Sequence, residues 1–224
     1  MAKAKVYAAF NPKTQEAFTF NSWSECEACV KGKPFRYRGF ATLSEAKAWL
    51  ESGAEYYYDP KAKQEALMKQ YTELDRDAIF CDSGQISGQN TEVNVSDFNG
   101  NSLIKDIRAS TSYGKFNENG YLELPKGKTN NYGELLGLYL ALVYAANKDI
   151  KTIYSDSRIV LDYWSVGAYN IDDEETVKLI KDVYIMRRGY ELGGGKILWV
   201  SGDVNPADLG RHKGGIASKL NKKA

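Results

Sequence analysis

The chain has few of the residues that build disulfide frameworks and zinc sites. Among its 224 residues there are three cysteines and one histidine, His212. Three cysteines cannot form a disulfide framework, and Cys26 with Cys29 makes a single C-x-x-C pair that lacks the second pair or the nearby histidines of a zinc site. We therefore interpret Cys26 and Cys29 as small, mostly buried apolar residues of one helix.

Long apolar runs and common hydrolase motifs are absent as well. No uncharged apolar segment approaches the roughly 20 residues that cross a bilayer, and the start, MAKAKVYAAF, lacks the hydrophobic core of a signal peptide. The sequence contains no G-x-S-x-G motif and no P-loop, and a single histidine excludes a two-histidine zinc centre. We expect a cytoplasmic protein whose chemistry depends on other residues.

The net charge of +1 does not by itself indicate nucleic-acid binding, but the charge is unevenly spread. The first 50 residues hold eight Lys or Arg and four Asp or Glu, a charge of +4, so the other 174 residues sum to −3. The last 14 residues hold five basic residues and no acid. Two basic regions around a slightly acidic middle fit a polyanion held at two places, although charge alone favours an ordinary solvated surface.

The first 53 residues have the pattern of a small αβ module. Apolar residues alternate in two short segments, 5–10 and 16–20, which we expect to be strands. Two S/T-x-x-E capping boxes, beginning at Ser22 and Thr42, predict two helices. Between them, residues 35–40 alternate aromatic and basic side chains, as a strand with two different faces would. The prediction is three strands and two helices around a very small core.

The rest of the chain has the pattern of a larger α/β domain. Residues 54–76 are polar and charged, and we interpret them as a linker that can hold one helix. The domain itself is expected at residues 77–218, followed by a basic tail at 219–224. Its expected elements are strands at 77–85, 91–97 and 102–108, the last two joined at Asn99-Gly100, a buried helix at 134–146, and strands at 152–156 and 196–201. This order predicts a mixed sheet with helices on its faces.

Four acidic residues stand where the predicted strands and helices begin or end. Asp82 follows the apolar run 78–81, Glu134 lies in the first turn of the buried helix, Asp156 ends a strand, and Asp208 follows Asn205-Pro206. Taken singly, each has a structural interpretation, because Asp156 suits a turn and Glu134 and Asp208 suit helix caps.

The four positions together favour a metal site. An acid within an apolar strand, as at Asp82, is costly unless a cation compensates it. Mg²⁺ prefers carboxylate oxygens, and two ions about 3.5–4 Å apart can stabilise the attacking and leaving oxygens of phosphodiester hydrolysis.

At these residues the chain resembles ribonuclease H. The segments that carry the resemblance are Ile79-Phe-Cys-Asp82-Ser-Gly, Thr129-Asn-Asn-Tyr-Gly-Glu134, Tyr154-Ser-Asp156-Ser-Arg and Trp199-Val-Ser-Gly…Asn205-Pro-Ala-Asp208. The resemblance implies a mixed five-stranded sheet, two Mg²⁺ or Mn²⁺ ions held by Asp82, Glu134, Asp156 and Asp208, and cleavage of the RNA strand of an RNA–DNA hybrid that leaves 5′-phosphate and 3′-hydroxyl ends. It also implies that Thr129, Asn130 and Asn131 contact the nucleic-acid backbone.

The sequence departs from the ribonuclease H pattern at two places. Many members have a histidine shortly after the Trp-Val-x-Gly strand, whereas this chain has Gly202-Asp203-Val204, and His212 lies beyond the fourth acid. The position after Asp156-Ser157 is often Gln and here is Arg158. These departures concern the proton-transfer step and the rate, while the four acids that define the reaction class are present.

The first 50 residues resemble the hybrid-binding module of ribonucleases H, also called the caulimovirus viroplasmin-like domain. Val6-Tyr7-Ala-Ala-Phe, Ser22-Trp23-Ser-Glu-Cys and Tyr37-Arg38-Gly-Phe-Ala-Thr carry the match. The resemblance implies that Trp23 and Tyr37 pack on the DNA strand, that Arg38 binds phosphate, and that Tyr7 belongs to the same binding surface. The alternative is that Trp23 and Tyr37 are core aromatic residues.

The sequence thus predicts a two-domain ribonuclease H of type 1 whose partner is an RNA–DNA hybrid duplex, with neither a membrane nor a protein partner implied. Two alternatives remain. One is a nucleic-acid-binding protein that kept the fold and lost turnover, against which the four intact acids argue. The other is a DNA-cutting relative of integrases or resolvases, which the hybrid-binding module disfavours.

Overall fold

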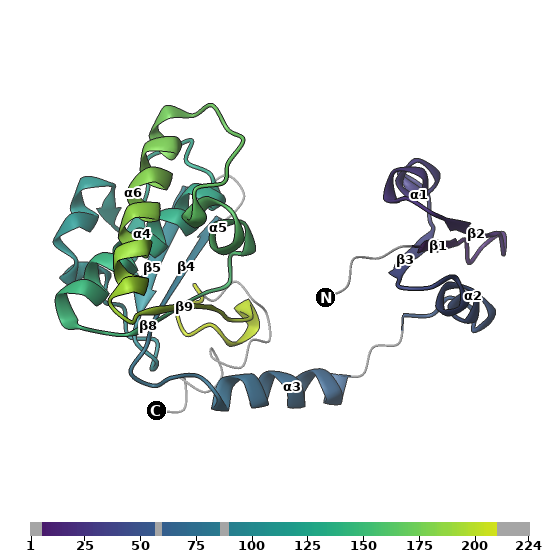
Figure 1. Cartoon of the computed structure of the whole chain (residues 1–224), viewed down its shortest axis with the longest axis horizontal. Helices are drawn as coiled ribbons and strands as arrows, with labels where there is room; N and C mark the ends of the chain where they lie inside the picture. The colour runs from purple at the N-terminus through teal and green to yellow at the C-terminus, as the bar shows by residue number, and fades with distance from the viewer. Residues whose placement is uncertain (1–5, 57–59, 86–89, 210–224) are drawn as a thin grey trace. The chain divides into compact units, whose positions relative to one another are not determined.

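The computed structural model describes residues 6–56, 60–85 and 90–209. The chain divides into two compact units, residues 1–60 and 61–224. The first holds α1, α2 and the strands β1 to β3, and the second holds the larger sheet with its helices (Figure 1). In the part of the chain that the structure describes, no helix combines the length and apolarity needed to cross a membrane.

The N-terminal unit contains the predicted three strands and two helices. Strand β1 (Val6–Phe10) is central and pairs antiparallel with β2 (Ala17–Phe20) and β3 (Arg36–Phe40). The helices are α1 (Trp23–Val30) and α2 (Leu43–Glu51). Both begin where the capping boxes predict, because the side chains of Ser22 and Thr42 accept hydrogen bonds from the third residue of each helix.

Each face of this small sheet is covered by one helix. Successive side chains of a strand point to opposite faces, so Ala8 of β1 packs with Trp49 of α2 while Ala9 packs with Cys26 and Val30 of α1. Cys26 is completely buried. Its role as a small apolar core residue is therefore as predicted.

The second unit begins with α3 (Pro60–Thr72) and contains a mixed sheet of six strands within the described residues. The strand order is β6-β7-β5-β4-β8-β9. Neighbouring strands from β6 to β4 pair antiparallel. The pairs β4–β8 and β8–β9 are parallel. The bounds are β4 Ile79–Gln85, β5 Thr91–Ser96, β6 Lys115–Phe116, β7 Leu122–Glu123, β8 Thr152–Ser155 and β9 Lys196–Trp199. The predicted mixed α/β fold is confirmed, and its sheet has six strands in the described residues where five were expected.

The prediction of a strand at 102–108 is wrong. The chain does turn at Gly100, which has a φ of 78°, but it pairs back only through one bridge, between Ser96 and Ser102. It then forms two 3₁₀ helices, η1 (Ile104–Asp106) and η2 (Arg108–Ser112). Ile104 and Ile107 are both buried, and a spacing of three residues places side chains on one side of a helical turn but on opposite faces of a strand. Short strands β7 and β6 extend the sheet instead.

The predicted buried helix is α4 (Asn130–Lys148), which packs against β4 and β5 and against α6 (Glu174–Leu192) (Figure 1). Its approach to the sheet is close at Gly133, where an added Cβ would lie 2.7 Å from Thr91 Cγ2 and 2.9 Å from Ser83 Cβ. Glycine is therefore required at this position, and it places the next residue, Glu134, against β4. The short helix α5 (Arg158–Asp162) follows β8.

A second apolar cluster covers the opposite side of β4. Phe80 stacks on Tyr154 of β8, with ring centroids 5.1 Å apart and an interplanar angle of 8°. Leu67 and Tyr71 of α3 pack against this cluster, so the helix predicted within the linker exists and is part of the second unit. Val204 and Ala207, which precede Asp208, are buried in the same cluster.

Candidate active site

Three of the four predicted acids come together in the second unit. Asp82 lies in β4, Glu134 in α4, and Asp156 directly after β8. Each offers a carboxylate oxygen, and these three oxygens lie within 4.8 Å of one another. Parallel strands β4 and β8 pair Cys81 with Ser155, so the next residue of each strand is an acid at the same edge of the sheet.

Asp82 and Glu134 are buried acids whose pKa values are raised. They are 4% and 6% exposed. Loss of solvation raises the pKa of Asp82 well above its usual range, and the charges of Asp156, Glu134 and Asp208 raise it further. Burial and the charge of Asp156 raise the pKa of Glu134 to about 8, against the hydrogen bonds that Ser83 and Asn130 donate. Without a compensating cation, the cluster therefore retains protons near neutral pH.

The carboxylate of Glu134 is held through one oxygen only. Its Oε1 accepts hydrogen bonds from the backbone N–H of Ser83, at 3.3 Å, and from Asn130 Nδ2, at 3.4 Å. Its buried Oε2 has no hydrogen-bond partner among the residues that the structure describes. A buried carboxylate oxygen without a donor, beside two further carboxylates, suits a hard divalent cation, which binds oxygen ligands.

Asp208 lies close enough for its charge to raise the pKa of Asp82, to which the backbone of Leu209 also donates a hydrogen bond. It stands outside the three-residue group within 4.8 Å, as far as the described residues show. Residues 205–209 form no helix; Pro206 and Ala207 form a turn, in which Asn205 Oδ1 accepts a hydrogen bond from the N–H of Ala207 at 3.1 Å. The chain after residue 209, with His212 and the basic tail, lies outside the described residues.

The three polar residues at the start of α4 have different environments. Thr129 is the N-cap, and its hydroxyl accepts a hydrogen bond from the N–H of Tyr132 at 3.2 Å. Asn130 faces inward and binds both Glu134 and the hydroxyl of Ser83, the latter at 3.1 Å. Asn131 is exposed. Of the three, Asn130 shapes the acidic cluster itself.

Three residues beside Asp156 and Asp82 were not predicted as site residues. Trp199 Nε1 donates to the backbone carbonyl of Asp156 at 3.1 Å, and the guanidinium of Arg158 lies 4.3 Å from the centre of the Trp199 ring. Ser83 donates its N–H to Glu134 and its hydroxyl to the Asn130 carbonyl, at 2.9 Å. The signal in the sequence was that all three stand in the quoted acidic segments: Ser83 directly follows Asp82, Arg158 follows Asp156 by two positions, and Trp199 begins the segment of Asp208.

The predicted nucleic-acid residues of the N-terminal unit form an exposed aromatic group. The Trp23 ring lies 5.7 Å from that of Tyr7 and 5.5 Å from that of Tyr37. Trp23 is 41% and Tyr37 is 44% exposed, so neither is a core residue. Tyr56 holds the backbone of Tyr37 through two hydrogen bonds of 2.7 Å, one to its N–H and one to its carbonyl. We call Tyr7, Trp23 and Tyr37 the aromatic surface.

Arg38 is the next residue of β3 and is exposed. Its guanidinium lies 5.5 Å from the centre of the Phe40 ring. Adjacent residues of a strand point to opposite faces, so Arg38 and Tyr37 leave β3 on different sides. The aromatic surface and this positive charge are therefore separate features of one strand.

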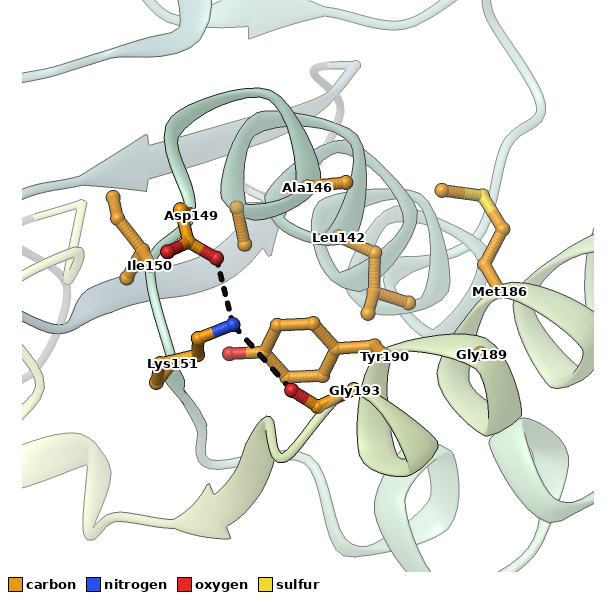
Figure 2. Close-up of a pocket in the computed structure, with 10 residues that line it drawn as sticks. Leu142, Ala146, Asp149, Ile150, Lys151, Met186, Gly189, Tyr190 and Gly193 are labelled. Atoms are coloured by element: carbon orange, nitrogen blue, oxygen red, sulfur yellow. Dashed lines mark hydrogen bonds and ion pairs between the residues drawn. The ribbon is translucent and has the colours of Figure 1, made fainter.

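An apolar pocket of about 360 Å³ lies between the ends of α4 and α6, lined by Leu142, Ala145, Ala146, Asp149, Ile150, Lys151, Met186, Gly189, Tyr190 and Gly193 (Figure 2). The Lys151 amine binds the Asp149 carboxylate at 2.6 Å and the Gly193 carbonyl at 3.4 Å (Figure 2). Lys151 precedes β8, whereas Asp156 follows it. The pocket is therefore at the opposite edge of the sheet from the acids and is not part of their site.

One protein-family model matches the N-terminal part of the chain. Residues 5–50 match the family model of the ribonuclease H1 N-terminal domain. The chain thus resembles a type 1 ribonuclease H that carries this domain. A search of curated protein sequences gives no significant match.

Solved structures of ribonuclease H1 are similar to this chain at low sequence identity. The enzyme of the halophilic archaeon Halobacterium salinarum is 17% identical and has a TM-score of 0.35; the match covers 55% of this chain and 84% of that one. LC11 ribonuclease H1, isolated from compost by a metagenomic approach, was solved in complex with an RNA/DNA hybrid. It is 16% identical with a TM-score of 0.36, and the match covers 66% of this chain and 94% of that one.

Proposed function

We propose that the chain is an endoribonuclease that hydrolyses the RNA strand of RNA–DNA hybrids, with a hybrid-binding domain at residues 1–53, a linker at 54–76 and a catalytic domain at 77–218. The observation that carries the proposal is the meeting of Asp82, Glu134 and Asp156, from three separate elements, within 4.8 Å. The match of residues 5–50 to the ribonuclease H1 N-terminal domain supports the choice of substrate. A cytoplasmic location belongs to the same proposal.

The residues present fit divalent metal. Asp82, Glu134, Asp156 and Asp208 would hold two Mg²⁺ or Mn²⁺ ions, since the set offers only oxygen ligands and Glu134 Oε2 has no donor among the described residues. When bound, such a pair supplies Lewis-acid stabilisation of the attacking and leaving oxygens of a phosphodiester, in a reaction that leaves 5′-phosphate and 3′-hydroxyl ends.

The chain's own groups orient the acids. The Ser83 N–H and the Asn130 amide hold Glu134 Oε1 and leave Oε2 for a ligand. The Trp199 indole holds the backbone of Asp156. Burial of Asp82 and Glu134 keeps water from competing for their oxygens, at the cost of raising both pKa values in the absence of a cation.

Substrate binding is proposed at two surfaces. Thr129, Asn130 and Asn131 stand at the N-terminus of α4, where free N–H groups and the helix dipole favour phosphate. In the N-terminal unit, the aromatic surface would pack on deoxyribose of the DNA strand, and Arg38 would bind a phosphate. The RNA 2′-hydroxyl would then distinguish a hybrid from double-stranded DNA.

The test is cleavage of an end-labelled RNA–DNA hybrid by the full chain, with Mg²⁺, with Mn²⁺ and with EDTA. Metal-dependent cleavage of the RNA strand, with 5′-phosphate products, is expected. Tight hybrid binding without cleavage in either metal would instead favour a non-catalytic binding protein. Cutting of double-stranded DNA in preference to hybrid would favour an integrase-like or resolvase-like enzyme.

A further inference from the structure

Two buried asparagines hold the segment that carries Asp208. Residues 205–209 belong to no strand and no helix of the described chain, so regular backbone pairing does not determine their place. Asn205 is completely buried and Asn94 is 2% exposed. A buried amide without hydrogen bonds is costly, so the partners of these two side chains constrain where the segment can lie.

Asn205 ties the segment to the strand of Asp82. Its Nδ2 donates to the carbonyl of Cys81 at 3.1 Å, and Cys81 is the residue before Asp82 in β4. Its Oδ1 accepts from the N–H of Ala207 at 3.1 Å. Asn205 thus connects the β4 strand to the turn before Asp208, and it belongs to the same sequence motif as Asp208.

Asn94 ties the segment to the neighbouring strand and belongs to none of the four acidic motifs. It lies opposite Asp82 in the antiparallel register of β4 and β5, so the two side chains share one face of the sheet. Its Nδ2 donates to the carbonyl of Ala207 at 3.1 Å, and Ala207 is bonded directly to Asp208.

Ser102 orients the Asn94 amide. The Ser102 hydroxyl donates to Asn94 Oδ1 at 2.8 Å. A carbonyl can only accept, so the amide must present its NH₂ group to Ala207, and the hydroxyl occupies its other end. The chain pairs with Ser96 at Ser102 after the turn at Gly100, and this bridge brings the Ser102 hydroxyl beside Asn94.

We propose that Asn94 is a positioning residue of the metal centre, which sets the place of Asp208 beside Asp82 through the Ala207 carbonyl, with Ser102 holding its amide. The inference rests on the proposed function, in which Asp82 and Asp208 are metal ligands. It adds a residue whose side chain touches neither metal nor substrate and acts through the backbone next to an acid.

The experiment is titration of the full, substrate-free chain with Mn²⁺ alone, by calorimetry. Asn94→Leu removes the donor with little change in volume and should weaken Mn²⁺ binding about tenfold, as loss of a residue that orients metal ligands does. In an Asp208→Asn background, the same substitution should change the Mn²⁺ affinity less than about twofold, because Asn94 acts through Asp208. Ser102→Ala should weaken binding in the same direction by a smaller factor.

Two controls separate this role from general stability. Ser110→Ala removes another buried hydroxyl, which donates to the Ile104 carbonyl at 3.1 Å, and should keep the wild-type Mn²⁺ affinity. Asp82→Asn should abolish strong Mn²⁺ binding. If Asp82→Asn binds Mn²⁺ like wild type, the metal centre is wrong and the inference fails with it.

If Asp82→Asn loses binding while Asn94→Leu keeps wild-type affinity, the inference alone is overturned. An equal loss from Asn94→Leu with and without Asp208 overturns it as well. Should Asn94→Leu not fold, as judged by circular dichroism, Ser102→Ala decides: wild-type affinity in that variant rejects the role of Asn94.

Discussion

The candidate functional residues of the two units differ in their exposure to solvent. The N-terminal unit exposes aromatic rings, with Trp23 41% and Tyr37 44% exposed, whereas the second unit buries acids, with Asp82 4% and Glu134 6% exposed. Exposed rings leave apolar surface in water and suit stacking on a ligand. Buried acids resist ionisation and suit a cation. In the proposed function, the aromatic surface and the metal ligands therefore lie in separate units, and each should be removable without loss of the other.

The largest effect is expected from the acids. Asp82→Asn and Asp156→Asn should each lower the rate of hybrid cleavage at least about a thousandfold, because they remove ligands rather than packing. Hybrid affinity, measured in EDTA, should stay near wild type, since Asp82 and Asp156 are assigned to metal and substrate binding is assigned to other residues. Wild-type-like turnover by Asp156→Asn would reject the site.

Metal removal should make stability depend on pH. The pKa of Glu134 is about 8 in the folded chain against an ordinary 4.5, and that of Asp82 is raised too, so the folded state binds more protons than the unfolded state between these values. Stability in EDTA should therefore fall as pH rises from about 4.5 to about 8. The check is the Tm at pH 5 and pH 8, with each kcal/mol worth about 2–4 °C.

Two additions sharpen this measurement. Mg²⁺ should raise the Tm more at pH 8 than at pH 5, because the ligands ionise more readily at the higher pH. Glu134→Gln should flatten the pH dependence in EDTA. A Tm that is independent of pH in both proteins would contradict the assigned burial of charge.

Removal of the N-terminal unit tests whether that unit binds the substrate. A chain that begins at residue 54 should keep a kcat close to that of the full chain and show a KM raised about tenfold or more, because a second attachment to the same duplex is lost. Steady-state cleavage at moderate salt measures both. An unchanged KM would show that the N-terminal unit does not hold the substrate.

Single substitutions in the aromatic surface should have smaller effects. Trp23→Ala and Tyr37→Ala should each weaken hybrid binding by about 1–3 kcal/mol, the range of aromatic contacts with nucleic acid. Phe18→Ala is the matched control, since Phe18 is 41% exposed in the same unit but lies outside the aromatic surface. Titrations use the Asp82→Asn chain to prevent cleavage. Equal losses for all three variants would reject a specific surface.

The smallest effect is expected from Arg38→Ala. An exposed cation that binds one phosphate should lower affinity for hybrid, DNA and RNA duplexes alike and reduce the salt dependence by about one phosphate contact. Binding at two salt concentrations measures this slope. A loss of affinity confined to the hybrid would mean that Arg38 recognises a feature of the hybrid other than phosphate charge.

Much of the architecture was predictable because local patterns carry it. The capping boxes at Ser22 and Thr42 placed both N-terminal helices, and the apolar helix behind Glu134 could only be buried. The prediction of a strand at 102–108 was wrong because tertiary packing buries Ile104 and Ile107 on one side of the segment. This burial outweighed the local preference of the segment for a strand.

The acids of the candidate site could be predicted from the sequence, but the residues that hydrogen-bond to the backbone beside them could not. Asp82 and Asp156 stand out because acids rarely follow apolar strands. The contacts of Asn94 with Ala207, and of Trp199 with Asp156, join residues 113 and 43 positions apart. Such hydrogen bonds have no local signature, since an asparagine in a strand or a tryptophan at its end is equally compatible with a solvated surface.

By itself the sequence determined most of the helices and strands, apart from the segment at 102–108 and the short strands β6 and β7, and it determined which acids are candidates for metal. Caps, periodicity and charge within apolar runs act over a few residues, so they can be recognised before the chain folds. The tertiary structure decided that Asp82, Glu134 and Asp156 meet within 4.8 Å and that Trp23 and Tyr37 are exposed. Parallel pairing of β4 with β8 and the close approach of α4 at Gly133 bring the acids together. Burial then raises the pKa values of Asp82 and Glu134, a property that no residue has before the chain folds.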